Sequence, residues 1–404
     1  MNDHALKDWL LIICCLAVSW ALFISVLLIT NLFLVFALIV LGGVAMYGIS
    51  RREGVKASIV QAFKRRSRFT FICMFIIIIG LPFILRGSPY WILILTLAIL
   101  WIIVALGINI QFGSAGIINL GAAAFYGVGA YTAGMFAIKL GSPPLFNLLL
   151  GAVMSMVVGS LLFIPLLKAR GHYLALVTIA FVMAFHNLLN NAEWLGGAQG
   201  IVGIPPMSVA GWSFVQEIKV WGLKLPSQAN FYYLALLLGG LLAAASWRLW
   251  NSWVGLTWNA INEGTGDELS AKCMGVATGK WAMIAFTIGN FYIGLAGAFY
   301  SHMTTYVSPP DITFYQSLLF LSAVILGGVD SIPGVCLAAL LLVILPEKLR
   351  AFQQYWVMFF GIALVLMLIL RRKGLIPAMI RIYTRGMREI PESLRAPKGS
   401  NKND

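Results

Sequence analysis

The sequence predicts an all-α polytopic membrane protein, and two observations lead to that prediction. Hydrophobic residues make up 60% of the 404 residues and charged residues only 10%, whereas soluble domains carry about 25% charged residues. The mean hydropathy is +0.91, and apolar runs recur along nearly the whole length. Because about 20 apolar residues cross a bilayer as a helix, the chain is expected to span the membrane many times.

The apolar runs predict roughly ten to twelve transmembrane helices in three regions. Residues 1–68 are expected to form an added N-terminal transmembrane hairpin and a basic loop, residues 69–372 the core, and residues 373–404 a basic tail. The runs begin near Trp9, Asn31, Phe69, Tyr90, Ala115, Leu145, His172, Phe231, Trp281, Tyr315, Gly334 and Tyr355.

The basic residues predict the orientation of the chain and argue against nucleic acid as a partner. The net charge is +14, and sixteen of the 28 Lys and Arg residues lie between Arg51 and Arg68 or from Arg371 onwards, beside apolar runs. Cytoplasmic loops of membrane proteins carry such an excess. We therefore expect contact with membrane lipid, with both termini and the stretch Arg248 to Lys280 in the cytoplasm, and Asn191 to Asn230 outside.

Several kinds of chemistry are disfavoured by the residues that the apolar runs lack. Ionisable side chains are nearly absent from these runs, and proton- or sodium-coupled transport normally needs them. The string GVATGKW (Gly275 to Trp281) has neither the spacing nor the Ser or Thr of a phosphate-binding loop. The histidines do not form a zinc-binding pattern, and Ser114 in FGSAG has no base at a defined spacing. We expect no catalytic residue, metal or cofactor.

One polar stretch, AINEGTGDELSAKCMGV (Ala260 to Val276), stands out because it carries three of the fourteen acidic residues. These residues, Glu263, Asp267 and Glu268, belong to a docking surface, a catalytic site or a solvated loop. Acidic residues suit the start of a short helix and Gly275 can end one.

Four stretches rich in glycine, alanine and aromatic residues follow one another within Leu106 to Arg372, about two-thirds of the chain. They are LGINIQFGSAGIINLGAAAFYGVGAYTA (Leu106 to Ala133), ARGHYLALVTIAF (Ala169 to Phe181), LGGAQGIVGIPP (Leu195 to Pro206) and GLAGAFYSHMTTYVSPPDITFYQSLLFLSAVILGGVDSIPG (Gly294 to Gly334). In this order and spacing they resemble the LivM-type permease subunit of branched-chain amino-acid ABC importers, within the superfamily of LivH-, LivM- and RbsC-like permeases.

The resemblance implies a type II-like ABC importer permease in the inner membrane of a bacterial cell. It implies that a LivH-like second permease completes the translocation path, and that two cytoplasmic LivG- and LivF-like ATPase subunits hydrolyse ATP. An extracytoplasmic substrate-binding protein would deliver the solute. The solute implied is a branched-chain or other hydrophobic amino acid. Urea, a short amide or another small organic solute of the same superfamily is the alternative, as is a stand-alone facilitator that needs no ATPase.

The resemblance also assigns the acidic stretch to a cytoplasmic coupling loop, residues 251–280, which docks into a cleft on the ATPase. The residues assigned to it are Glu263, Asp267, Glu268, Ala271, Met274 and Gly275. This chain departs from the family pattern in four places: Asn259 and Asn262 replace basic residues, Gly264 to Gly266 form an insertion, Ala122 replaces a common histidine, and Asp330 replaces a common glycine.

Polar and aromatic residues in the signature helices are candidates for the translocation path: Asn119, Tyr126, Tyr131 and Thr178. Hydrogen bonding between helices is the competing interpretation of the polar ones. Outside the membrane, four glycines are expected where φ is positive or where a side chain would clash, at the mouth of the path: Gly196, Gly197, Gly200 and Gly203.

Overall fold

The computed structural model describes residues 67–166, 172–209, 212–220, 223–262, 264, 266–348 and 374–376, with isolated positions before and after these ranges. The expected N-terminal hairpin, the span near Tyr355 and most of the basic tail lie outside the described residues. Within them the fold is helical, which confirms the all-α class. Six described segments are long and apolar enough to cross a membrane: Pro89–Ser114, Pro144–Pro165, Tyr173–Asn191, Gln228–Trp250, Thr278–Thr304 and Pro309–Gly327.

The helices differ in how much of their surface other helices cover. In Pro89–Ser114 and in Thr278–Thr304, 67% of an apolar stretch of 18 residues is buried. In Tyr173–Asn191 the corresponding share is 17%. A helix that is apolar all round and covered all round belongs to the core, so the first two segments form the centre and the third lies at the periphery. Further helices are α4 (Ser67–Ile84), α10 (Trp253–Ile261), α11 (Glu268–Cys273), α13 (Phe314–Gly327) and α14 (Ile332–Lys348).

Glycines allow three of the helices to approach one another closely. The three are α6 (Ala122–Leu140), α7 (Pro144–Leu166) and α12 (Thr278–Thr304). A Cβ atom on Gly129 would lie 2.1 Å from the carbonyl oxygen of Gly294, and one on Gly297 would lie 2.0 Å from that of Tyr126. In lipid, such small residues provide the close packing that holds helices together. Parts of the first and fourth signature stretches, in α6 and α12, therefore meet in space at the centre of the protein.

The expected helix start at Ala115 is wrong, because α6 begins at Ala122. After α5 (Pro89–Ile108) the chain makes a single π-helical segment, η1 (Asn109–Ser114), and then runs without helix to residue 121. The amide of Gly121 donates to Oδ1 of Asn119 at 2.9 Å, and this local bond competes with helix formation. Non-helical backbone of this kind is tolerated beside a membrane span where protein covers it.

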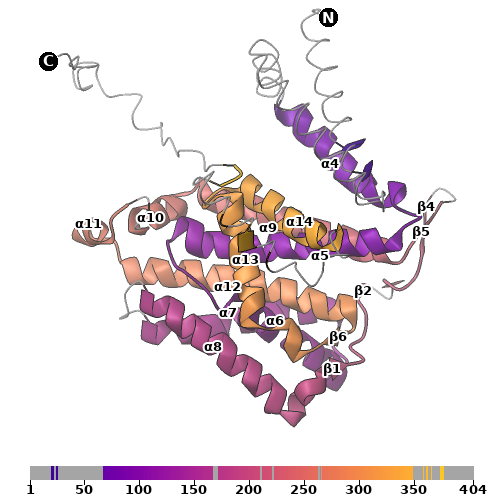
Figure 1. The fold of residues 1–404 in the computed structure, drawn as a ribbon, viewed down its shortest axis with the longest axis horizontal. Helices are drawn as coiled ribbons and strands as arrows, with labels where there is room; N and C mark the ends of the chain where they lie inside the picture. The colour runs from indigo at the N-terminus through magenta and orange to yellow at the C-terminus, as the bar shows by residue number, and fades with distance from the viewer. Residues whose placement is uncertain are drawn as a thin grey trace, which may run out of the picture.

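The two ends of the helix bundle carry different structures (Figure 1). Helices α10 and α11 lie at one end, and all the labelled strands lie at the other. Helix α9 (Gln228–Trp250) connects the two ends, so the predicted placement of Arg248 to Lys280 opposite Asn191 to Asn230 is consistent with the fold. The remaining elements are α8 (His172–Asn191), η2 (Glu193–Leu195), η3 (Gly197–Gln199), β1 (Ile201–Val202), β2 (Ser208–Val209), β3 (Trp212–Ser213), β4 (Ile218–Val220), β5 (Leu223–Leu225), β6 (Tyr306–Val307) and η4 (Pro309–Asp311).

Candidate functional site: a capped helix and a buried polar interior

The acidic stretch folds into the short helix α11, and Asp267 is its N-cap. The carboxylate of Asp267 accepts from the amides of Leu269 and Ser270 at 3.1 and 3.3 Å, and also from the Ser270 hydroxyl. The Ser270 hydroxyl first, and then the two amides, hold the pKa of Asp267 below its usual 3.8, because each of these hydrogen bonds favours the ionised form. An ionised cap satisfies amides that the helix itself cannot.

The other end of α11 closes with a Schellman motif around Gly275. The amide of Val276 donates to Ala271 O and that of Gly275 to Lys272 O, both at 3.0 Å. Gly275 has a φ of +85°, the left-handed conformation that glycine adopts at this position. The helix is therefore fixed at both ends by its own sequence.

Helix α11 presents apolar side chains to solvent rather than burying them. Met274 is 85% exposed and Leu269 is 69% exposed, whereas Ala271 is buried against the rest of the chain. Glu268 pairs with Lys272 at 2.6 Å and accepts from the hydroxyl of Thr278 at 3.0 Å, which joins α11 to the start of α12. Glu263, also assigned to this stretch, lies outside the described residues.

Gly266, the last residue of the insertion Gly264 to Gly266, packs against the end of α10. A Cβ atom on Gly266 would lie 2.5 Å from the carbonyl oxygen of Ala260, so the backbone passes too close for any side chain. Asn262, one of the two asparagines that replace basic residues, is buried and accepts from the amide of Gly264 at 2.9 Å. Asn262 and the glycines of the insertion thus lie together between α10 and α11, whereas Ala122 begins α6 and Asp330 lies between α13 and α14.

Three amide side chains meet in the interior between α5, α6 and α12. Asn119 donates to Gln111 Oε1 at 2.9 Å, and Gln111 donates to Asn290 Oδ1 at 3.1 Å and to Phe286 O at 2.9 Å. All three amides are fully buried. Asn119, a predicted path residue, is therefore tied to two helices. Gln111 and Asn290 were not predicted from the sequence, although an amide inside an apolar run is a signal that could have found them.

The other three path candidates are buried as well. Thr178 accepts from the amide of Leu120 at 3.1 Å and donates to Ala175 O at 2.9 Å. The ring of Tyr126 lies 5.7 Å from that of Tyr300. The hydroxyl of Tyr131 is buried and has no hydrogen-bond partner among the described residues. Asn119, Tyr126 and Tyr131 come from one continuous stretch, and Thr178 joins it from α8.

All four glycines of the predicted external turn have positive φ, from 55° at Gly197 to 92° at Gly196. A Cβ atom on Gly200 would lie 2.1 Å from Val307 O, whereas one on Gly203 would meet nothing within 4 Å. Strand β1 then pairs antiparallel with β6. The turn is therefore held against the segment that follows α12.

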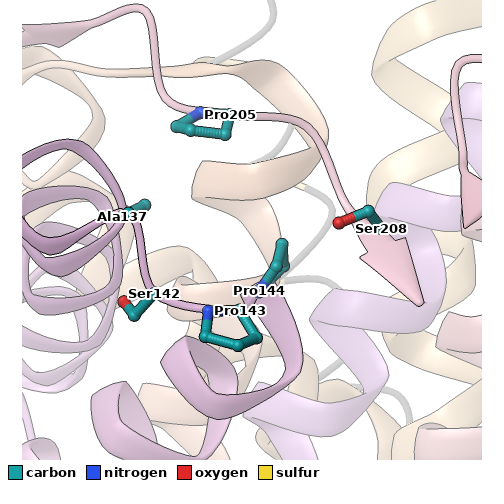
Figure 2. Close-up of a pocket in the computed structure, with 7 residues that line it drawn as sticks. Ala137, Ser142, Pro143, Pro144, Pro205 and Ser208 are labelled. Atoms are coloured by element: carbon teal, nitrogen blue, oxygen red, sulfur yellow. The ribbon is translucent and has the colours of Figure 1, made fainter. Parts of the chain in front are cut away.

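A cavity of about 490 Å³ opens beside this turn. Figure 2 shows Pro205 and Ser208 on one side of it and Ser142 with Pro143 on the other. The carbonyl of Pro205 accepts from Nδ1 of His302 at 2.8 Å, which fixes one wall of the cavity to α12. Its full lining is Ala137, Gly141, Ser142, Pro143, Pro144, Pro205 and Ser208.

Comparison with known proteins identifies the family. Residues 90–368 match the family described as branched-chain amino acid transport system / permease component. The chain belongs to this permease family. It is 34% identical over 326 residues to the high-affinity branched-chain amino acid transport system permease protein LivM of Escherichia coli (strain K12), covering 77% of this chain and 75% of that relative.

Two further relatives extend the comparison of this permease. The protein of the same name in Salmonella typhimurium (strain LT2) is 35% identical over 326 residues, with coverage of 77% and 75%. The probable branched-chain amino acid transport permease protein LivM of Methanocaldococcus jannaschii is 26% identical over 332 residues, which cover 69% of this permease and 90% of the relative. No solved structure matches this permease.

Proposed function

We propose that this permease forms, with a LivH-like second permease, the path by which an ATP-driven importer moves branched-chain or other hydrophobic amino acids across the inner membrane. Two relatives at 34–35% identity bear the name of branched-chain amino acid permeases. One structural observation carries the proposal: α11 is capped at both ends, yet it exposes Met274 and Leu269. Exposed apolar side chains on a fixed element are typical of a contact surface.

In this proposal residues 251–280 form the coupling loop, and separate LivG- and LivF-like ATPase subunits bind it and hydrolyse ATP. Leu269 and Met274 enter the ATPase cleft, while Asp267 and Gly275 keep the helix short and rigid. Ala271 holds the helix against the permease, and Glu268 connects it to α12 through Thr278. Glu263 precedes this helix in the same loop.

The proposal places α10, α11 and both termini in the cytoplasm. The external turn at Gly196, Gly197, Gly200 and Gly203, with the cavity beside it, then faces the substrate-binding protein and shapes the mouth of the path. Labelling of single cysteines in intact cells tests this orientation. A cysteine at Ser227 should react with a membrane-impermeant reagent and one at Ser58 should not, and the reverse pattern would contradict the assignment.

We also propose that Tyr126 and Tyr131 contribute to the path, because they are aromatic residues of the signature helix in the interior of the bundle. Asn119 precedes them in the same stretch, and Thr178 accepts from the amide of Leu120 within it. The hydrogen bonds of Asn119 to Gln111 and of Thr178 to Ala175 favour a role in holding this stretch in place. A largely apolar lining would pass a hydrophobic amino acid without retaining it.

Reconstitution of the complete complex in proteoliposomes tests the function. Leucine uptake should require ATP and the binding protein, and excess isoleucine or valine should reduce it while urea should not. Preferential uptake of urea would point to the alternative solute class. Equilibration of leucine by this chain alone, without ATPase, would show a facilitator instead.

A further inference from the structure

Asp330 lies in the tight turn between α13 and α14 with a backbone conformation that few residues adopt. Its φ is +65°, and Thr305 is the one other non-glycine residue with positive φ among those described. A left-handed conformation costs a residue with a Cβ atom free energy, so it persists where surrounding contacts hold it. The contacts of Asp330 are therefore informative.

Three hydrogen bonds hold Asp330 to the ends of two other helices. Its carboxylate accepts from the hydroxyl of Ser114 at 2.7 Å and from the indole N–H of Trp250 at 3.0 Å. Its backbone amide donates to Oδ1 of Asn109 at 2.9 Å. Trp250 is the last residue of α9, and Asn109 and Ser114 bound the π-helical segment η1. We call Asn109, Ser114, Trp250 and Asp330 the Asp330 junction.

Residues 262–275 of the coupling loop, here called the coupling segment, contact the same π-helical segment through Asn262. The side-chain amide of Asn262 donates to Gly113 O at 2.8 Å and to Ser114 O at 3.3 Å. Asn262 is the C-cap of α10 and stands five residues before Asp267, the N-cap of α11. One side chain therefore connects the segment that carries α11 to the backbone of Ser114, whose hydroxyl reaches Asp330.

Close packing leaves little freedom along this connection. A Cβ atom on Gly113 would lie 2.7 Å from the amide nitrogen of Asp330. On the Asn262 side, a Cβ atom on Gly116 would lie 3.0 Å from Oδ1 of Asn262. A tightly packed contact transmits displacement rather than absorbing it. Movement of Asn262 should therefore displace the turn between α13 and α14.

We infer that Asn262, Ser114 and Asp330 form the link through which the coupling segment positions the α13–α14 turn during transport, with Asp330 as a positioning residue. The inference rests on the proposed function, because it assigns the movement of α11 to the ATPase. Residues beyond α14 also contact this turn: the amides of Leu375 and Ile376 donate to Leu326 O and Gly327 O at 2.9 and 3.1 Å. The link therefore reaches the ends of α5, α9 and α13 together.

Hydrogen exchange of the purified permease in nanodiscs tests the link without any partner protein. Asn262→Ala should raise the exchange rates of the backbone amides of Asp330 and Ser331 by about tenfold. The substitution removes the hydrogen bonds of the buried Asn262 side chain, so local opening of the turn becomes easier. Thr257→Ala is the matched control, because the Thr257 hydroxyl donates to Trp253 O within α10, and it should leave these two amides unchanged. Faster exchange confined to residues around Asn262 would overturn the link.

Transport assays on the reconstituted complex then test what the link does. Asp330→Gly keeps the left-handed turn accessible but removes the carboxylate bonds to Ser114 and Trp250, and it should lower leucine uptake per ATP hydrolysed by about tenfold. Asp330→Asn can still accept from Trp250 and donate to Ser114, and it should restore coupling. Asn262→Ala combined with Asp330→Gly should be no worse than the more severe single variant.

Two results would count against this role in transport. Uptake and ATP hydrolysis falling in proportion, with less assembled complex, would show that the junction serves folding alone. Multiplying effects in the double variant would show that Asn262 and Asp330 act independently. If the wild-type complex showed no ATP-driven uptake, the proposed function would fail while the exchange experiment would still decide whether the link exists.

Discussion

Val276 donates its backbone N–H to the carbonyl of Ala271 at 3.0 Å, and this bond closes α11 at Gly275. A Cβ atom on Gly275 would meet nothing within 4 Å, so the space beside the glycine is open in this chain. In the proposed importer, the ATPase fills that space.

Gly275→Trp should therefore impair the complex more than the permease alone. The positive φ costs about 1–2 kcal/mol for a residue with a Cβ atom, and Gly275→Asn, which tolerates this conformation better, serves as the control. We expect the Trp variant to lose ATPase binding, or to hydrolyse ATP without moving leucine, while the Asn variant retains most uptake. Normal uptake by the Gly275→Trp variant would show that α11 is a solvent-exposed element without a docking role.

The cap at Asp267 predicts a pH dependence confined to acid. The folded-state pKa lies below the usual 3.8, so the cap stabilises α11 fully above that value and loses its effect as pH falls through the lower folded-state pKa. Exchange of the Leu269 and Ser270 amides, corrected for the intrinsic rate, should stay constant from about pH 8 to pH 5. Asp267→Ala should accelerate it severalfold and Asp267→Asn much less. Equal protection in all three proteins would contradict the cap.

Substituting two glycines of the predicted external turn distinguishes the effect of backbone strain from the effect of a steric clash. Gly200 and Gly203 have similar φ, 73° and 81°, but only a side chain at Gly200 would meet Val307 O. Gly200→Ala should displace β1 from β6 and lower uptake strongly, whereas Gly203→Ala should cost only the strain, about 1–2 kcal/mol of stability. Gly197→Val with Gly200→Val should abolish uptake in an assembled complex. Equal effects of Gly200→Ala and Gly203→Ala on uptake would show that the turn acts only as a spacer.

Much of this architecture followed from the sequence, and the exceptions have physical causes. Apolar runs long enough to cross a bilayer predicted helices whose first residues lie within a few positions of Tyr90, Leu145, Phe231 and Trp281. The helix expected at Ala115 begins seven residues later, because an apolar, glycine-rich stretch gives the same hydropathy whether or not it is helical. The bonds that decide its shape, between Asn119, Gln111 and Asn290, join residues up to 179 positions apart.

The site residues also divide into those that local sequence patterns predict and those that depend on distant residues. Asp267 and Gly275 act within a few residues of their own positions, so capping rules predicted the helix that they enclose. Asp330 was noticeable only as a departure from a family pattern. Its partners Ser114 and Trp250 are 216 and 80 residues away, and no local rule connects them.

Substitution of a buried amide and of a buried tyrosine should have opposite effects on stability. Asn119→Ala leaves Gln111 Oε1 without its donor and should destabilise the permease by about 1–3 kcal/mol. Tyr131→Phe removes a buried hydroxyl that lacks a partner among the described residues, so stability should stay equal or rise by about 1 kcal/mol. Thermal unfolding in detergent measures both. If Tyr131 lines the path, its variant should also change the KM for leucine.

The most direct test of the coupling assignment uses Cys273, the last residue of α11, which is exposed two positions before Gly275. With Cys14, Cys15, Cys73 and Cys336 replaced, Cys273 should crosslink to a cysteine placed in the ATPase cleft, and the yield should change with nucleotide. A cysteine at Val215, exposed at the opposite end of the protein, is the control and should give no crosslink to the ATPase. Absence of any crosslink from Cys273 at every cleft position, in a complex that still transports leucine, would contradict the account.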